Sequence, residues 1–216
     1  MHISILCTNP EHPVIKSLRE WISDMSLKGH VCSLVYDKSQ LQKGDILFLV
    51  SCSQIVSNTE RKRFKATLVL HASDLPKGRG WSPYIWEIIN GANLITVSLL
   101  EAEDQIDNGA IWLKKEFNLQ GHELLPEIYE KLFRTQLQLM TKAVESFQTI
   151  VPKPQSGEPG KYYRKRTPSD SRLDPEKSIA EQFNLLRVVD FDRFPAFFDF
   201  CGQRYFIKIK KTHDES

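Results

Sequence analysis

The stretch Ile46-Leu-Phe-Leu-Val50 decides the fold class of this chain. Consecutive apolar residues leave it no polar face, which is typical of a strand that a sheet buries on both sides. Thr67 to Leu70 has the same character, and Met1 to Thr8 and Val31 to Tyr36 also favour strands. Between the last two runs, apolar residues recur at helical spacing over 14–22. The alternation predicts an α/β fold with a Rossmann-like, mostly parallel sheet and helices on both faces.

The later part of the chain continues this pattern and then changes in composition. We expect a short helix over 82–89, strands over 95–100 and 110–117, a long amphipathic helix over 123–150 and a last helix over 175–189. Between the last two, Val151 to Gly160 carries three prolines and two glycines, which indicates a linker or an extended arm. The sequence therefore predicts a main domain over 1–150 and a short α+β extension over 151–216.

The overall composition does not indicate a particular class of binding partner. The 216 residues are 41% hydrophobic, enough for one good core and a small appendage, and the net charge is +2. Neither nucleic acid nor a membrane surface is required by that balance, although basic clusters occur locally. Arg61 to Lys65 is interpreted as a solvated segment. Lys161-Tyr-Tyr-Arg-Lys-Arg166 mixes aromatic and basic residues, so it either holds phosphates and a base or packs an arm onto the core.

The cysteines and the N-terminus indicate the compartment. Cys7, Cys32, Cys52 and Cys201 show no Cys-x-x-Cys spacing, and the first three lie in apolar runs. We therefore expect free thiols and no metal site. With no secretory segment or membrane-length apolar run recognised, the expected localisation is the cytoplasm and no membrane partner is expected.

A histidine and an aspartate stand in two turns that are suited to a site. The strand ending at Leu70 is followed by His71-Ala-Ser-Asp-Leu-Pro-Lys-Gly-Arg-Gly-Trp-Ser-Pro83, and Asp107 lies in Gln105-Ile-Asp-Asn-Gly109. Glycine lets backbone approach a ligand closely, and a histidine with a carboxylate can move protons near neutral pH. The alternatives are a satisfied core histidine and a plain Asx-turn aspartate.

The order His71-x-Ser-x-Leu-Pro-x-x-Arg-Gly-x-x-Pro83, followed later by Asp107-x-Gly109, resembles the folate-dependent formyltransferase family, which includes methionyl-tRNA formyltransferases. The tail pattern Arg166-x-Pro-x-Asp-x-x-x-Asp174, with Asn184 to Arg187 and Phe194 to Phe198, is most similar to the sugar-nucleotide N-formyltransferases. The resemblance implies an enzyme that uses 10-formyltetrahydrofolate as co-substrate. It also implies small-molecule substrates, with nucleic acid not expected.

The resemblance assigns roles to residues of this sequence. His71 would stabilise the oxyanion or accept the amine proton, and Asp107 would orient the imidazole and relay the proton. Relatives place an asparagine two residues before the histidine, where this chain has Val69. The amide donor is thus missing. We expect a substitute in the turn after Val50, with Ser51 leading and Ser53 second.

The remaining predicted residues belong to the two ligands. The residues expected at the cofactor are Arg79, Gly80, Leu99, Leu100, Glu101 and Ile106; Arg79 can equally pair with a local acid. The residues expected at the acceptor are Ser73, Lys77, Tyr163, Arg166, Asn184 and Arg187; the alternative for the tail residues among them is packing of the arm onto the core.

The acceptor predicted from the resemblance is a nucleotide-linked 4-amino-4,6-dideoxy sugar, for instance a pseudaminic-acid precursor, used in cell-surface polysaccharide biosynthesis. A tRNA acceptor is disfavoured because transfer-RNA enzymes carry a large module after the catalytic domain, and about sixty residues follow the linker here. Alternatives are another small or carrier-bound amine, and a non-catalytic relative that binds sugar nucleotides or RNA. The aromatic residues Phe191, Phe194 and Phe197 either pack the tail or form a homodimer contact.

Overall fold

A computed structural model describes residues 1–212, and its centre is a six-stranded sheet with strand order β2-β1-β3-β4-β6-β7. The strands span His2–Leu6 (β1), Val31–Val35 (β2), Gly44–Leu49 (β3), Phe64–His71 (β4), Leu94–Glu101 (β6) and Ile111–Asn118 (β7). The first four run parallel, whereas β6 is antiparallel to both β4 and β7. The predicted α/β fold with a mostly parallel sheet is confirmed.

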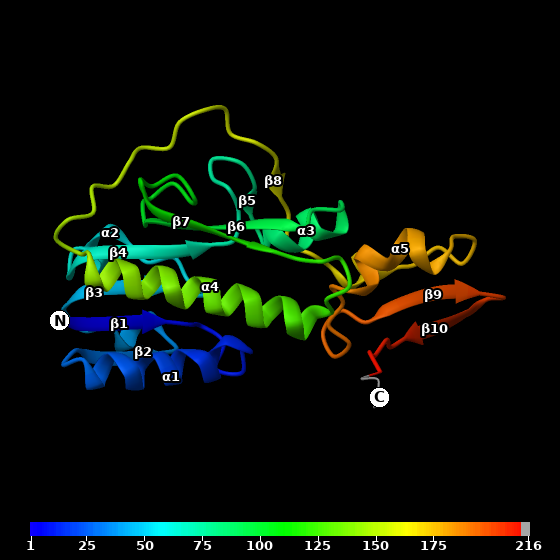
Figure 1. The fold of residues 1–216 in the computed structure, drawn as a ribbon, viewed down its shortest axis with the longest axis horizontal. Helices are drawn as coiled ribbons and strands as arrows, with labels where there is room; N and C mark the ends of the chain where they lie inside the picture. Colours follow the sequence, from blue (N-terminus) through cyan, green and yellow to red (C-terminus); the bar gives the residue numbers. More distant parts are fainter. Residues whose placement is uncertain (213–216) are drawn as a thin grey trace.

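Two long helices cover one face of this sheet. Helices α1 (Val14–Leu27) and α4 (Leu125–Glu145) contact each other and pack on the strands, as Figure 1 shows with α4 crossing in front. Along β3, Ile46 and Phe48 face this helical layer, while Leu47 and Leu49 point to the other face. Consecutive burial on β3 is therefore explained by burial on both sides, as its sequence indicates.

The other face is covered by shorter segments. Leu41, Val56 and Phe64 form a separate apolar cluster there with Leu47 and Leu49. The short helix α2 (Asn58–Arg61) contacts β4 on this face. Helix α3 (Pro83–Ile89) contacts β6 and packs instead against the start of α4, where its Ile85 and Ile88 share an apolar cluster with Leu125. This thinner layer matters for function, because it leaves room beside the sheet for a cavity.

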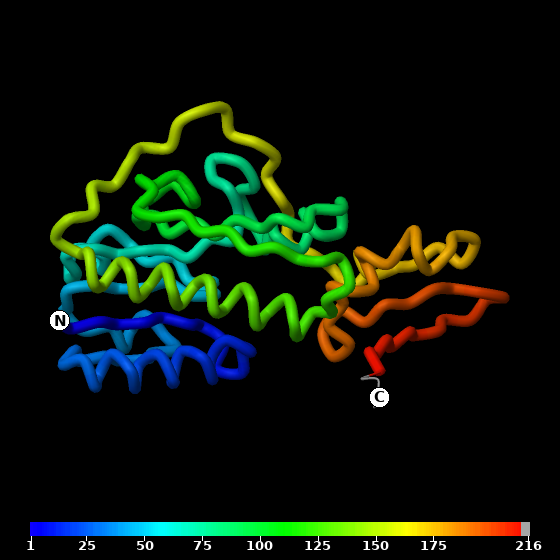
Figure 2. Tube along the Cα trace, viewed as in Figure 1, coloured from blue at the N-terminus to red at the C-terminus, as the bar shows by residue number. Residues whose placement is uncertain are grey.

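The extension begins with an arm that runs over the main domain. The arm, yellow in Figure 2, arches across the sheet and brings β8 (Tyr162–Tyr163) beside β5 (Arg79–Gly80), with which it pairs in parallel. Lys153 also exchanges two backbone hydrogen bonds with Ile111, at 2.7 and 2.9 Å. The segment is thus an extended arm bonded to the domain. The domain boundary at residue 150 stays a prediction.

The rest of the extension is a short helix and a hairpin. After a 3-10 turn (Pro168–Ser171) come α5 (Ile179–Leu186) and the antiparallel strands β9 (Ala196–Phe200) and β10 (Gln203–Ile207), which project from one end of the molecule in Figure 1. Helix α5 is shorter than the predicted 175–189. Its start is fixed by a capping box, in which Ser178 accepts from the Glu181 amide and donates its own amide to the Glu181 carboxylate.

Several features named from the sequence can be placed. The four cysteines are free. Phe197 is buried in the tail, Phe194 lines the cavity described below and Phe191 is 40% exposed. No helix within residues 1–212 combines the length and apolar character needed to cross a membrane.

Candidate active site

A cavity of about 710 Å³ lies at the carboxyl ends of three neighbouring parallel strands. Thr8 follows β1, Ser51 follows β3 and His71 ends β4, and all three line the cavity. Ligands of open α/β sheets bind at this edge, and pockets for small ligands commonly measure roughly 300–1,000 Å³. Position and size both mark it as a binding site.

Inside the cavity, His71 faces Asp107. The imidazole Nδ1 lies 3.4 Å from Asp107 Oδ1, and both side chains are more than nine-tenths buried. The second carboxylate oxygen, Oδ2, accepts the backbone N–H of Gly80 at 2.9 Å. The other ring nitrogen, His71 Nε2, lies 2.9 Å from the carbonyl oxygen of Gly78. The structure thus brings together the two residues that the sequence singled out.

These contacts define where a proton resides. A carbonyl oxygen only accepts, so His71 Nε2 carries a hydrogen and donates it to Gly78. A neutral imidazole would then turn a lone pair from Nδ1 toward the Asp107 carboxylate, which repels it. A proton between Nδ1 and Oδ1 removes that repulsion. The His71–Asp107 pair is therefore built to hold one proton that it can give or take.

The loops that hold the pair leave little room for other side chains. A Cβ on Gly80 would lie 2.2 Å from the Tyr163 carbonyl oxygen, and one on Gly109 would lie 1.9 Å from that of Glu101. Asp107 itself has φ +56°, a left-handed conformation that aspartate tolerates better than most residues. From the arm, Gln155 Nε2 donates to the carbonyls of Asp107 and Gly109, both at 2.9 Å. The arm therefore fixes the loop that carries Asp107.

Val69 and the serine turn sit on the same cavity. Val69 lies two residues before His71 on β4, so both side chains point to the same face, and both line the cavity. Ser51 and Ser53 line it as well. Thr8 ties this turn to β1, because its hydroxyl accepts the Ser53 N–H at 2.9 Å and contacts the Ser53 hydroxyl at 3.0 Å. The predicted substitute donors are close to the cavity, and their role stays a prediction.

The residues predicted for the cofactor fall into two groups. Gly80, Glu101 and Ile106 line the cavity. Leu99 and Leu100 are buried in β6 and do not, because that strand is internal and only its last residue, Glu101, and the loop after it reach the cavity. Arg79 is also outside the lining. Its guanidinium donates to Asn108 Oδ1 at 2.9 Å, so it pairs with a local polar residue instead.

Of the residues predicted for the acceptor, only Arg166 lines the cavity. The other five pack elsewhere. Ser73 is fully buried, Lys77 is exposed beside Gly160, and Tyr163 stacks on Trp86 with ring centroids 6.4 Å apart. Asn184 lies on α5 near Gly91, and the buried Arg187 donates to Asn93 Oδ1 at 2.9 Å and lies 3.9 Å from Glu123.

The cavity also has lining residues that the sequence did not reveal. They are polar or aromatic and come from four segments: His12, Trp81, Tyr84, Tyr129, Gln136, Asp190 and Arg193. Tyr162 and Lys165 also line the cavity, but they belong to the basic and aromatic cluster 161–166 that the sequence had singled out. Gln136 is 6% exposed, and its Oε1 has no hydrogen-bond partner within the described residues, so it can accept from a ligand. Gln136 breaks the apolar stripe of α4, which was the one available sequence signal.

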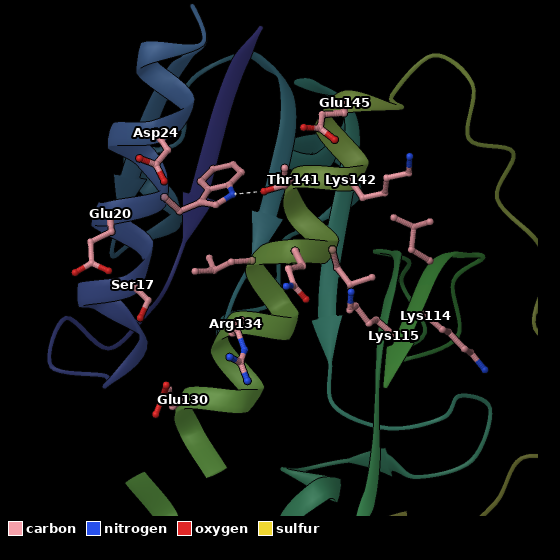
Figure 3. A pocket seen from close by; sticks show the side chains of 15 residues that line it. Ser17, Glu20, Asp24, Lys114, Lys115, Glu130, Arg134, Thr141, Lys142 and Glu145 are labelled. Carbon is pink, nitrogen blue, oxygen red and sulfur yellow. Dashed lines mark hydrogen bonds between the residues drawn. The ribbon is translucent and has the colours of Figure 1, made fainter. Parts of the chain in front are cut away.

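A second hollow, of about 760 Å³, lies between α1, α4 and β7 (Figure 3). It shares no lining residue with the first cavity, and its walls carry lysine, arginine, glutamate and aspartate but neither histidine nor cysteine. In Figure 3, the indole Nε1 of Trp21 donates to the Thr141 hydroxyl, at 2.8 Å, across the gap between the helices. Among residues 1–212, no cluster of three or more His, Cys, Asp or Glu side chains could hold a metal ion.

The chain is similar to proteins of a known family. A family model described as "Formyl transferase" matches residues 23–144, more than half of the chain. Methionyl-tRNA formyltransferase of Rickettsia bellii is 30% identical over 136 residues, which cover 62% of this chain and 44% of that protein. The chain thus aligns with less than half of that relative's length.

Two solved structures show the same fold. HypX from Aquifex aeolicus, in complex with tetrahydrofolic acid, superposes with a TM-score of 0.78 at 19% identity, covering 94% of this chain and 36% of that one. A 4-N formyltransferase from Francisella tularensis gives a TM-score of 0.74 at 17% identity, covering 98% of both chains. At these identities the likeness establishes the fold alone.

Proposed function

This chain belongs to the formyl transferase family, and we propose that it transfers a formyl group from 10-formyltetrahydrofolate to the amine of a nucleotide-linked amino sugar. The observation that carries the proposal is the His71–Asp107 pair, buried at 3.4 Å inside a cavity at the carboxyl edge of the sheet. Such a pair serves a reaction in which an amine must lose a proton while a carbonyl oxygen gains charge.

The cavity suits the formyl donor. One wall is apolar, formed by Leu49, Val56 and Val69, and a flat ring can lie against it. Beside that wall runs the loop from Glu101 to Asp107, whose carboxylates and backbone carbonyls can accept from the N–H groups of a pterin. Bound there, 10-formyltetrahydrofolate would supply the formyl carbon. The tetrahydrofolate complex of HypX supports this choice of donor.

The side chains would divide the proton work. As the amine nitrogen bonds to the formyl carbon, Asp107 takes up one amine proton, while the proton that the pair already shares stays on His71 Nδ1, so that a positively charged imidazole lies near the oxygen that becomes negative. When the bond to the folate nitrogen breaks, the pair returns a proton to that nitrogen. The net products are a formamide and tetrahydrofolate, so the pair ends in its starting state. The carbonyl of Gly78 keeps the imidazole in one orientation throughout.

The second donor for the formyl oxygen is proposed to be Ser51. Its hydroxyl lies on the cavity wall after β3, the strand beside β4, where Val69 occupies the place of the amide. The Ser51→Ala variant should lose roughly tenfold to a thousandfold in kcat/KM, since an oxyanion donor is typically worth about that much. The reciprocal variant Val69→Asn should restore activity in the Ser51→Ala background. Unchanged kcat/KM in both Ser51→Ala and Ser53→Ala would exclude the serine turn.

A small acceptor is favoured by what closes the cavity. Tyr162, Lys165, Arg166 and Phe194, all from the arm and tail, line it together with the main domain. The acceptor side is thus walled by this chain's own extension, which suits a compact substrate with a charged group. The likeness to a sugar N-formyltransferase from a Shewanella species, which covers 100% of this chain and 99% of that one at a TM-score of 0.73 and 18% identity, supports a sugar amine. Methionyl-tRNA is the competing acceptor, because relatives named for it match this chain, one of them over 62% of its length.

A direct assay tests the proposal. Tetrahydrofolate release is followed after mixing the protein with 10-formyltetrahydrofolate and, separately, UDP- and dTDP-linked amino sugars or methionyl-tRNA. Release is expected with at least one sugar, and His71→Ala should reduce it by several orders of magnitude in a folded protein. Release with methionyl-tRNA and with none of the sugars would refute the sugar assignment. No release with any acceptor would refute the transferase activity.

A further inference from the structure

Two arginines meet on one phenylalanine in the cavity wall. The guanidinium carbons of Arg166 and Arg193 lie 5.5 and 5.6 Å from the centroid of the Phe194 ring, and all three residues line the cavity. Such contacts hold cations in place without neutralising their charge. The wall therefore presents two positive groups at a fixed separation from one ring.

Arg166 is not neutralised by a local acid. Asp170, four residues further on, forms its ion pair with Arg164. Arg166 donates one hydrogen bond, to the Ser171 hydroxyl at 3.0 Å, and its buried Nε has no partner within residues 1–212. Burial lowers the pKa of this guanidinium below its ordinary value, which records the cost of holding the charge there. A half-buried cation with a free donor is the pattern of a site that binds an anion.

Arg193 is more open but faces the same region. Its side chain is 54% exposed, and its only carboxylate neighbour in the described chain, Asp190, is loosely placed at 3.8 Å. Burial and the charge of Arg193 together lower the pKa of His12 to about 4, so the histidine is neutral near pH 7. His12 Nδ1 accepts the Val14 N–H at 3.2 Å, so the neutral ring carries its hydrogen on Nε2, which is then a donor.

Two tyrosine hydroxyls complete the group. Tyr84 and Tyr129 line the cavity near Arg166 and Arg193, whose positive charges act to lower the pKa of both tyrosines. Burial raises the pKa of both hydroxyls, so both remain neutral; the Tyr84 hydroxyl also interacts with that of Tyr129, which leaves the Tyr129 O–H as the donor toward a ligand. We call Arg166, Arg193, His12, Tyr84 and Tyr129 the donor cluster. Asp190 is the one acidic side chain beside it in the cavity lining, so the cluster keeps a positive balance.

We propose that the donor cluster is an anion subsite that binds the diphosphate of a small acceptor molecule while its amine lies at the His71–Asp107 pair. The assignment of the acceptor rests on the proposed function; the anion subsite itself rests on the cluster. Charge is distributed unevenly around the cavity. Three carboxylates, those of Glu101, Glu103 and Asp104, lie at the proposed pterin site, whereas the two arginines lie on the arm and the tail. An anionic acceptor would be repelled by the first set and attracted by the second, which orients it.

The test is calorimetric titration of the full chain with inorganic pyrophosphate. Saturable binding is expected, weakened about tenfold or more in Arg193→Gln, since hydrogen bonds to charged groups contribute strongly. Binding should be abolished in the Arg166→Gln/Arg193→Gln double variant. The matched control is Arg204→Gln, because Arg204 also lies over a phenylalanine of the tail, 4.2 Å from Phe197, but outside the cavity. Thermal melts establish that each variant is folded. If the double variant does not fold, the single variant Arg193→Gln, at an exposed position, tests the subsite by itself.

The outcomes separate the two proposals. Equal affinity for pyrophosphate in wild type and Arg193→Gln, or no binding by wild type, overturns the subsite. His71→Ala should abolish formyl transfer yet leave pyrophosphate binding intact, so a failed transfer assay with intact binding counts against the proposed function alone. UDP should displace pyrophosphate. Displacement by an RNA acceptor-stem hairpin and not by UDP would overturn the assignment to a small acceptor.

Discussion

Replacing Asp107 by asparagine isolates the proton chemistry of the site from its architecture. Asparagine has nearly the same shape and tolerates the φ of +56° at this position. Its amide oxygen can still accept the Gly80 N–H, now held at 2.9 Å by Oδ2. Its amide nitrogen would face His71 Nδ1, 3.4 Å from the atom it replaces, and donate to it. Every contact survives, but the shared proton does not.

The expected loss is therefore catalytic. With Nε2 donating to Gly78 and Nδ1 accepting from the amide, His71 is fixed as a neutral imidazole, and residue 107 can no longer take the amine proton. General acid–base groups typically contribute about 10²–10⁴ in rate, so kcat/KM should fall by that factor, roughly 3–5 kcal/mol of transition-state stabilisation. The free energy of unfolding should change by less than about 1 kcal/mol, because the hydrogen bonds are replaced.

The assay is tetrahydrofolate release with a productive acceptor, alongside urea unfolding of the same preparations. Asp45→Asn is the matched control. Asp45 also accepts a backbone N–H, that of His2 at 2.7 Å, but it lies at the amino end of β3 away from the cavity. Its kcat/KM should stay within about twofold of wild type, as for a surface change without a specific role. A kcat/KM of Asp107→Asn within threefold of wild type would refute the reasoning that the pair exchanges a proton.

Three further predictions concern the frame around the site. Gly80→Ala should lower kcat/KM at least about tenfold, because the new Cβ would lie 2.2 Å from the Tyr163 carbonyl oxygen and must displace either β8 or the Gly80 N–H that holds Asp107. Gly157→Ala is the control and should retain activity, because Gly157 has a similar φ but no atom within 4 Å of an added Cβ. Thr141→Val should lower the free energy of unfolding by about 1–2 kcal/mol in urea titrations and leave kcat/KM unchanged, because the buried Trp21 Nε1–H loses its partner. Burial raises the pKa of Glu123, but hydrogen bonds from Lys131 and the backbone outweigh it and bring the pKa down to about 2; the stabilisation is present above the unfolded value of 4.5 and is lost as the pH falls toward 2. Glu123→Gln should thus be less stable than wild type by about 3 kcal/mol at pH 7, with the difference shrinking to near zero at pH 2, and a difference that does not depend on pH would contradict this origin.

The sequence predicted the parts of the fold in which one residue pattern has one structural solution. The run 46–50 is apolar at every position, its neighbour 67–70 is apolar at every position but Thr67, and both became central strands of the sheet. The same pattern does not encode strand direction. Nothing in residues 94–101 distinguishes a parallel from an antiparallel partner, and β6 runs against β4 because the chain returns through α3 and a turn at Gly91.

For the site, the sequence could predict residues that occur in a fixed order near one another in the chain. His71 and Asp107 belong to such an order, and the structure places them 3.4 Å apart. The predictions of Leu99 and Leu100 located the right strand, but only its last residue, Glu101, and the loop after it reach the cavity. Side-chain direction at a strand end depends on how far the ladder continues, and that is set by pairing with distant strands.

Arg193 shows why the remaining residues were out of reach. In the sequence it stands between Asp192 and Phe194, close to Asp190, where an arginine is expected to be a solvated partner of its acidic neighbours. Arg193 comes to lie near Arg166 only when the tail folds back onto the arm, so that both guanidinium groups contact the Phe194 ring. Local charge pairing and tertiary charge clustering thus make opposite predictions for this residue. Pyrophosphate binding decides between them, because a solvated arginine paired with Asp190 would contribute nothing to it and a member of the donor cluster would account for most of it.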